Sequence, residues 1–204
     1  AHLWFGDFVT MRWFDDVWMK EVYANLFADK LVAPEFSAVD HDLRFLMQNH
    51  AYAYEVDRTS GTNPILQPLE NLNGAGALYG PIVYQKSPVV MRQLEARLGA
   101  AGLRAGLRDY LQRHRRGNAS WDDLVAALAP YDSGDLKAWA DVWVRLKGRP
   151  TLRAEVSLGP TGKTRRVRVL SGGPWTQKVE VSYAGEGLPA KVEGPSSDAA
   201  GGAG

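Results

Sequence analysis

Apolar side chains recur every three or four positions along the first three quarters of the chain, which is the spacing of helices with one buried face. Leu103, Leu107 and Leu111, for example, fall on one side of a helix. The pattern therefore predicts a largely helical region. Its expected helices cover, in chain order, residues 1–6, 16–32, 38–56, 87–98, 103–116, 120–130 and 135–147.

Residues that favour helix ends mark several of these boundaries. Asp15 or Asp16 is expected to cap the helix over 16–32, because a carboxylate can accept hydrogen bonds from the free N–H groups of the first turn. Ser87, followed by proline, is expected to begin the next well-marked helix. Ser120, with an aspartate three residues later, resembles a capping box.

Beyond residue 149 the apolar positions alternate with polar ones, which is the period of a half-buried strand. We expect a domain boundary at 149/150 and three antiparallel strands after it. The final stretch, 195–204, is rich in glycine and alanine and too poor in large apolar groups to pack. The strands are expected over residues 152–158, 165–171 and 178–184.

The composition is that of a globular protein. The 204 residues are 45% hydrophobic and carry a net charge of +1 with acids and bases interspersed, which argues against a nucleic-acid partner. No apolar run approaches the roughly 18 residues that a membrane-spanning helix needs. The chain has no cysteine, so a bound metal would need histidine and carboxylate ligands. The lack of cysteine also fits a reducing compartment, which favours the cytoplasm.

The histidines do not mark a metal site by themselves. The chain has four: His2, His41, His50 and His114. A single histidine is more often a surface or structural residue than a ligand. His41 and His50 are nine positions apart and therefore do not share the one-turn spacing of helical metal sites. His114 lies in a basic run at a helix terminus, where a cation complements the helix dipole.

The first 31 residues of the chain allow a more specific interpretation. Their sequence is AHLWFGDFVTMRWFDDVWMKEVYANLFADKL. They resemble a stretch of the aminopeptidase N family of zinc aminopeptidases (gluzincins) that begins at the fourth residue of the His-Glu-x-x-His motif. In the family a glutamate ligand follows the second histidine after eighteen residues. Eighteen residues also lie between His2 and Glu21. The matching letters are Trp4, Phe5, Gly6, Asp7, Val9, Thr10, Met11, Trp13, Asp16 and Trp18.

A second segment, IVYQKSPVVMRQLE over 82–95, resembles the family segment in which a tyrosine precedes a lysine by two residues. The resemblance implies that Tyr84 donates a hydrogen bond to the oxyanion of the tetrahedral intermediate. The segment over 135–152 resembles, more weakly, the end of the family's helical catalytic domain. The resemblance thus implies a mainly α fold: the C-terminal helical part of a thermolysin-like catalytic domain over 1–149, followed by strands of a β-sandwich domain over 150–194.

The implied function is that of a zinc-dependent metallo-aminopeptidase, which removes single residues from the N-termini of peptides. His2 and Glu21 would hold zinc (Zn2+), and Tyr84 would act on the substrate. By the same resemblance, the first zinc histidine, the general-base glutamate and the motif that grips the substrate amine would precede Ala1. We therefore expect these 204 residues alone to be inactive.

Two positions depart from the family pattern. Val22 stands where a glycine is usual, and Ala28, beside Asp29, stands where an acidic residue is common. Other interpretations also remain: a leukotriene-A4-hydrolase-like relative, a non-catalytic scaffold relative, and a helical interaction module with a β appendage. The joint presence of the histidine, the glutamate and the tyrosine favours the peptidase, because a scaffold has no physical need for all three.

Overall fold

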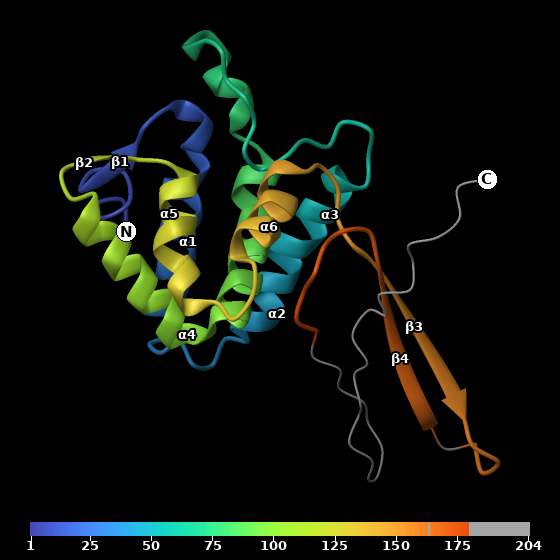
Figure 1. Ribbon diagram of the computed structural model, residues 1–204. Helices are drawn as coiled ribbons and strands as arrows, with labels where there is room; N and C mark the ends of the chain where they lie inside the picture. Colours follow the sequence, from blue (N-terminus) through green and yellow to red (C-terminus); the bar gives the residue numbers. More distant parts are fainter. Residues whose placement is uncertain (163, 180–204) are drawn as a thin grey trace. The chain divides into compact units, whose positions relative to one another are not determined.

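A computed structural model describes residues 1–162 and 164–179 (Figure 1). Contacts divide the chain into two units, Ala1–Gly148 and Arg149–Gly204. The first is built from helices and the second begins with an antiparallel strand pair, so the mainly α fold class is confirmed. Their assignment to a catalytic domain and a β-sandwich domain stays a prediction.

In the first unit, most α-helices continue at one end into a short 3₁₀-helical or π-helical turn. The π-turn Leu46–His50 joins two short helices into one continuous helix over 41–57, and the π-turn Ile82–Lys86 similarly extends the longest helix. The regular elements are β1 (Val9–Met11), α1 (Trp18–Val32), α2 (His41–Phe45), α3 (Ala51–Asp57), α4 (Ser87–Arg113), β2 (Gly117–Ala119), α5 (Trp121–Leu128) and α6 (Leu136–Ala140).

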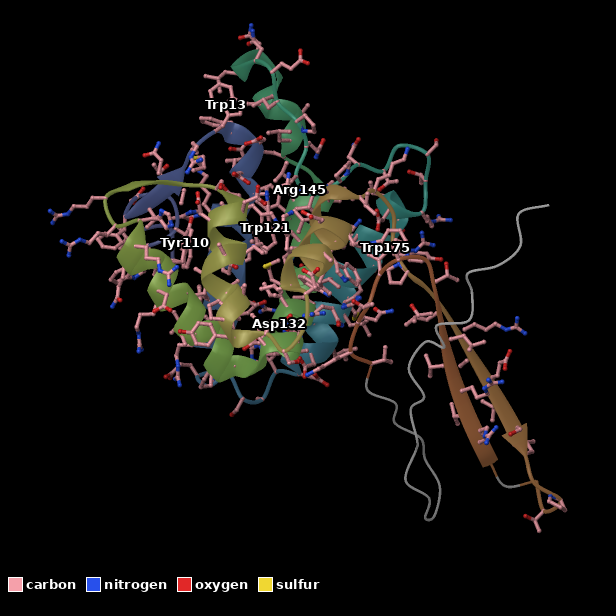
Figure 2. The ribbon with its side chains drawn as sticks, viewed as in Figure 1. Trp13, Tyr110, Trp121, Asp132, Arg145 and Trp175 are labelled. Carbon is pink, nitrogen blue, oxygen red and sulfur yellow. The ribbon has the colours of Figure 1, made fainter. Side chains whose placement is uncertain are left out.

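The core of this unit lies among α1, α4 and α5 (Figure 2). Trp18 and Trp121 meet edge to face, with ring centroids 5.0 Å apart. Gly106 permits the close approach of α4 to α5, because an added Cβ would lie 2.6 Å from a methyl carbon of Leu128. The other fully buried large side chains of these three helices are Val22, Tyr23, Val90, Met91, Leu94 and Leu124.

The two short strands lie side by side near the N-terminus (Figure 1). They pair in parallel, with Val9 opposite Gly117 and Met11 opposite Ala119. Arg116 extends this contact by donating its backbone N–H to the Phe8 carbonyl at 2.7 Å. The start of the chain is therefore fixed against the segment that follows α4.

The α-helix α4 begins at Ser87, as predicted, but Ser87 does not cap it. Helical turns begin at Ile82, and the Ser87 hydroxyl donates to the carbonyl of Val83. Pro88 has no N–H to offer the preceding turn, and the Ser87 N–H bonds instead to Ile82 across a π-turn. The serine and the wide turn together accommodate Pro88 in the first turn of α4, so the π-turn runs directly into the α-helix.

The predicted cap at the start of α1 is also wrong. The residue before α1, Val17, gives no side-chain cap. Asp16 is only 5% exposed, and its Oδ2 accepts a hydrogen bond of 3.2 Å from the backbone N–H of Trp121, the first residue of α5. Asp16 therefore caps a helix more than 100 residues away. The capping box of Ser120 with Asp123 is confirmed.

The second unit contains β3 (Thr151–Leu158) and β4 (Thr164–Gly172), which pair antiparallel with Val156 opposite Val167. The predicted strands over 152–158 and 165–171 are confirmed. The third, over 178–184, and the tail over 195–204 fall largely or wholly outside the described residues. No helix in the described part of the chain is long and apolar enough to cross a membrane.

Burial raises the pKa of Asp16 to about 6, against the hydrogen bond from Trp121, which lowers it. The folded state therefore binds this proton more tightly than the unfolded state, so the contribution of Asp16 to stability declines as the pH rises from about 4 to about 6. We expect Asp16→Asn to gain stability relative to the wild type, by on the order of 2–3 kcal/mol, between pH 4 and pH 7. Urea unfolding at each pH measures this.

The matched control is Asp15→Asn, which removes a carboxylate from the same turn and leaves the Trp121 N–H contact in place. A pH-dependent gain of equal size in the control would contradict the assignment to Asp16.

Candidate metal centre

The segment that carries His2 is held against α1 by aromatic stacking. Phe5 closes one helical turn by donating its N–H to the Ala1 carbonyl at 3.0 Å. Its ring is buried and stacks on Tyr23, with centroids 4.6 Å apart. Residues 1–6 form hydrogen-bonded turns in place of the expected regular helix. Gly6 follows with φ of +130°, a conformation that L side chains rarely adopt, so the chain can turn back toward β1.

This stacking brings His2 to Glu21, two residues before Tyr23 on α1. His2 Nε2 lies 3.9 Å from Glu21 Oε2. Two atoms that each bind one zinc at 2.0–2.2 Å lie at most about 4.2 Å apart, so the pair fits a shared zinc. The histidine side chain is half-exposed, whereas the glutamate is 15% exposed. The open side of the pair therefore lies toward His2.

Lys20, which the sequence analysis did not single out, contacts the same carboxylate. Its Nζ lies 3.5 Å from Glu21 Oε1. One carboxylate oxygen of Glu21 therefore faces Lys20, and the other faces His2. A lysine next to a glutamate ligand gives only a weak sequence signal, because adjacent helical residues point in different directions.

Tyr84 reaches the same carboxylate from the π-turn at the start of the long helix. Burial raises the pKa of Tyr84, and so do the charge of Glu21, the neighbouring Tyr79 and a hydrogen bond with Glu21. The ring of Tyr79 stacks on that of Tyr84 with centroids 6.2 Å apart. The phenol consequently keeps its proton at neutral pH and remains a hydrogen-bond donor. The structure thus brings together all three residues singled out from the sequence.

The remaining histidines are occupied elsewhere. His41 Nε2 lies 3.0 Å from the Phe36 carbonyl, His50 meets Phe45 edge to face, and His114 packs on Tyr110. Across residues 1–162 and 164–179, no group of three or more His, Cys, Asp or Glu side chains could hold a metal ion. Among the residues predicted to hold a metal, His2 and Glu21 lie close enough together to share one.

A buried ion pair anchors the segment that carries Tyr84. Lys86 Nζ lies 3.0 Å from Asp57 Oδ1 and 2.6 Å from the Gly148 carbonyl, and both side chains are about 5% exposed. Thr62 donates to the same Asp57 oxygen. Lys86 is the lysine two residues after Tyr84 in the segment that resembles the family. Its place on an apolar helix face, four residues from both Ile82 and Val90, is the signal of a buried, paired lysine.

A cleft of about 490 Å³ opens beside Tyr84. Residues of α1, of the helix over 41–57 and of the start of the long helix line it. Ala28, the position that departs from the family pattern, is part of the lining, together with Asp29. The other departure, Val22, is fully buried in the core and faces away from solvent.

Comparison with known families agrees with this geometry. The peptidase family M1 domain matches residues 1–143 of the chain. The chain belongs to peptidase family M1. Members of this family are metallopeptidases, which accords with a histidine and a glutamate that face each other at metal-binding distance.

Individual relatives carry consistent names. The chain is 33% identical over 164 residues to an aminopeptidase N of Streptomyces lividans, a match that covers 79% of this chain and 19% of the relative. It is 35% identical to an aminopeptidase N of Lactococcus lactis (76% and 19%) and 29% identical to a leucyl aminopeptidase of Saccharolobus solfataricus (77% and 20%). The chain thus spans about a fifth of the length of these relatives.

The ion pair below Tyr84 gives a stability prediction. Lys86→Met leaves the Asp57 carboxylate buried without its ammonium partner, which should cost about 3–5 kcal/mol in urea unfolding. Replacing both residues, in Lys86→Met/Asp57→Leu, should restore much of the loss, because no buried charge remains.

Lys30→Met is the matched control, since Lys30 pairs with Glu95 at 2.7 Å on the surface. It should cost less than about 1 kcal/mol. The ion pair would not be the anchor if Lys86→Met cost no more than this control.

Proposed function

We propose that the chain carries part of the active site of a zinc-dependent aminopeptidase that removes N-terminal residues from peptides. The observation that supports this most strongly is the convergence of His2, Glu21 and Tyr84 from three segments. Aminopeptidase names among the relatives support the reaction class. No contact within the described residues favours the leukotriene-A4-hydrolase-like alternative or the non-catalytic scaffold.

In this proposal His2 offers Nε2 and Glu21 offers Oε2 to the zinc, and further ligands come from outside the described residues. Zinc bound there would polarise a water molecule and the carbonyl of the bond to be cleaved. Lys20 holds the other oxygen of Glu21 and so keeps Oε2 turned toward the histidine, a contact of the kind that orients metal ligands.

Tyr84 acts on the substrate. Its protonated phenol donates a hydrogen bond to the substrate oxygen on which negative charge develops as the carbonyl is attacked. The stacked ring of Tyr79 and the buried Lys86 hold the tyrosine in place, so the donor is oriented before the reaction begins. Such preorganisation is what makes a single donor effective.

The metal site gives the first test. Because the described residues supply two donors, we expect the 204-residue chain to bind zinc weakly and not to cleave leucine p-nitroanilide. In calorimetric titration, His2→Ala and Glu21→Gln should each weaken zinc binding by more than about tenfold, since loss of even an outer-shell contact commonly costs 10–100-fold.

His114→Ala, which removes a histidine packed on Tyr110, should leave zinc binding unchanged. Zinc affinity that is the same in all three variants would contradict the assignment of His2 and Glu21. Anilide cleavage by the 204-residue chain would show that donors from outside it are unnecessary.

The role of Tyr84 is tested in a polypeptide that contains this chain together with a complete metal site. Tyr84→Phe should lower kcat by about 10²–10³-fold and change KM little, because the lost hydrogen bond forms only as charge develops. Tyr79→Phe is the matched control, since it keeps the stacked ring and should retain activity. An unchanged kcat in Tyr84→Phe would remove the tyrosine from the mechanism.

A further inference from the structure

A small cavity lies among the first turn of the chain, β1, the start of α1 and the C-terminal half of α4. It shares no lining residue with the cleft beside Tyr84. Its volume is about 10 Å³, and one water molecule needs roughly 10–15 Å³ measured in this way. The cavity therefore has the size of a single water molecule and is too small for any larger ligand.

Asp16 brings a buried carboxylate to this cavity. The side chain is 5% exposed, and its Oδ2 accepts the hydrogen bond from the Trp121 N–H. Within the described residues, Oδ1 is buried and has no hydrogen-bond partner. A buried polar atom without a hydrogen bond costs free energy, and a charged one costs most. Ordered water is a common partner for such atoms.

Two further side-chain oxygens line the cavity, those of Tyr110 and Thr10. Burial raises the pKa of Tyr110, and so does the nearby charge of Asp16, so the phenol keeps its proton and remains a donor. Its hydroxyl forms no hydrogen bond with another described residue. The Thr10 hydroxyl donates to Met11 Sδ at 3.3 Å, which leaves its oxygen free to accept.

Lys20 also lines the cavity but does not neutralise Asp16. Its ammonium faces Glu21 instead, with Nζ 3.5 Å from Oε1. Its apolar stem faces the cavity wall at Gly6, where an added Cβ would lie 3.6 Å from Lys20 Cδ. Among the described residues, no lysine or arginine forms an ion pair with Asp16. The Asp16 carboxylate therefore needs a hydrogen-bond donor other than a protein cation.

We propose that this cavity binds one ordered water molecule, which accepts a hydrogen bond from the Tyr110 hydroxyl and donates to Asp16 Oδ1 and Thr10 Oγ1. Three polar partners are the usual number for a buried water molecule. The water joins β1, the turn before α1 and α4 at one point, and it hydrates the carboxylate that caps α5. The site contains none of the three residues of the candidate metal centre, so the inference is independent of the proposed function.

A crystal structure of the 204-residue chain tests the site directly. A density peak should lie within hydrogen-bond distance of both Asp16 Oδ1 and the Tyr110 hydroxyl. Asp16→Leu should remove this peak, whereas the matched control Asp15→Leu should retain it. No peak in the wild type overturns the inference. An anomalous peak at the same place after soaking in rubidium chloride also overturns it, because the cavity would then bind a monovalent cation.

Stability in solution gives a second test that does not depend on crystals or on the folding of Asp16→Leu. If the water is bound, Tyr110→Phe removes a buried hydrogen bond and should lower the folding equilibrium constant about fivefold in urea unfolding. Without the water, the same change removes a buried hydroxyl that has no partner, which is neutral or stabilising. The matched control is Tyr52→Phe, whose hydroxyl is on an exposed side chain and which should change stability little.

Equal stability of Tyr110→Phe and the wild type overturns the inference. Where Asp16→Leu folds, the two changes should also be coupled, since both remove the same water molecule. Tyr110→Phe should then cost little in the Asp16→Leu background. A full, additive loss in that background likewise overturns the inference, because the tyrosine would not share a bound water with the aspartate.

Discussion

The buried contact of Lys86 with Asp57 and the Gly148 carbonyl is the constraint on which the helical unit depends. It joins the end of α3, the start of the long helix and the last residue of the unit at one point. A buried ammonium must be paired, so each segment is held in the one place where the charge is satisfied. Tyr84 lies in the same turn as Lys86, two residues before it, so this contact also positions Tyr84.

The candidate metal centre depends on a second, apolar constraint. The stacking of Phe5 on Tyr23 is what brings the first turn of the chain to α1 and so places His2 beside Glu21. One constraint places His2 beside Glu21, and the other holds the segment that carries Tyr84.

Much of the fold could be predicted where local chemistry and packing agree. The capping box at Ser120 and the alternation over 152–158 depend only on neighbouring residues, and the structure follows them. Asp16 and Ser87 do not cap their own helices for the same reason: each side chain hydrogen-bonds to another group. For Asp16 this is the N–H of Trp121, and for Ser87 a carbonyl left free by a proline.

The candidate site was predictable to a different degree. Spacing and matching letters pointed to His2, Glu21 and Tyr84, because a family motif identifies residues that meet in the folded protein although they lie apart in the sequence. Lys20 and the cleft beside Tyr84 are not part of such a motif. The contact of Lys20 with Glu21 lies within α1. The cleft depends on how α1 and the helix over 41–57 face each other, which the period of apolar residues on either helix does not determine.

The parallel pair of β1 and β2 has a consequence for how the protein is made. Val9 pairs with Gly117, so more than 100 residues must be synthesised before the first strand meets its partner. Closing so long a loop is entropically costly and slows folding. Until β2 has left the ribosome, β1 lacks the strand with which it pairs. This interval is when the nascent chain is most exposed to aggregation and to chaperones.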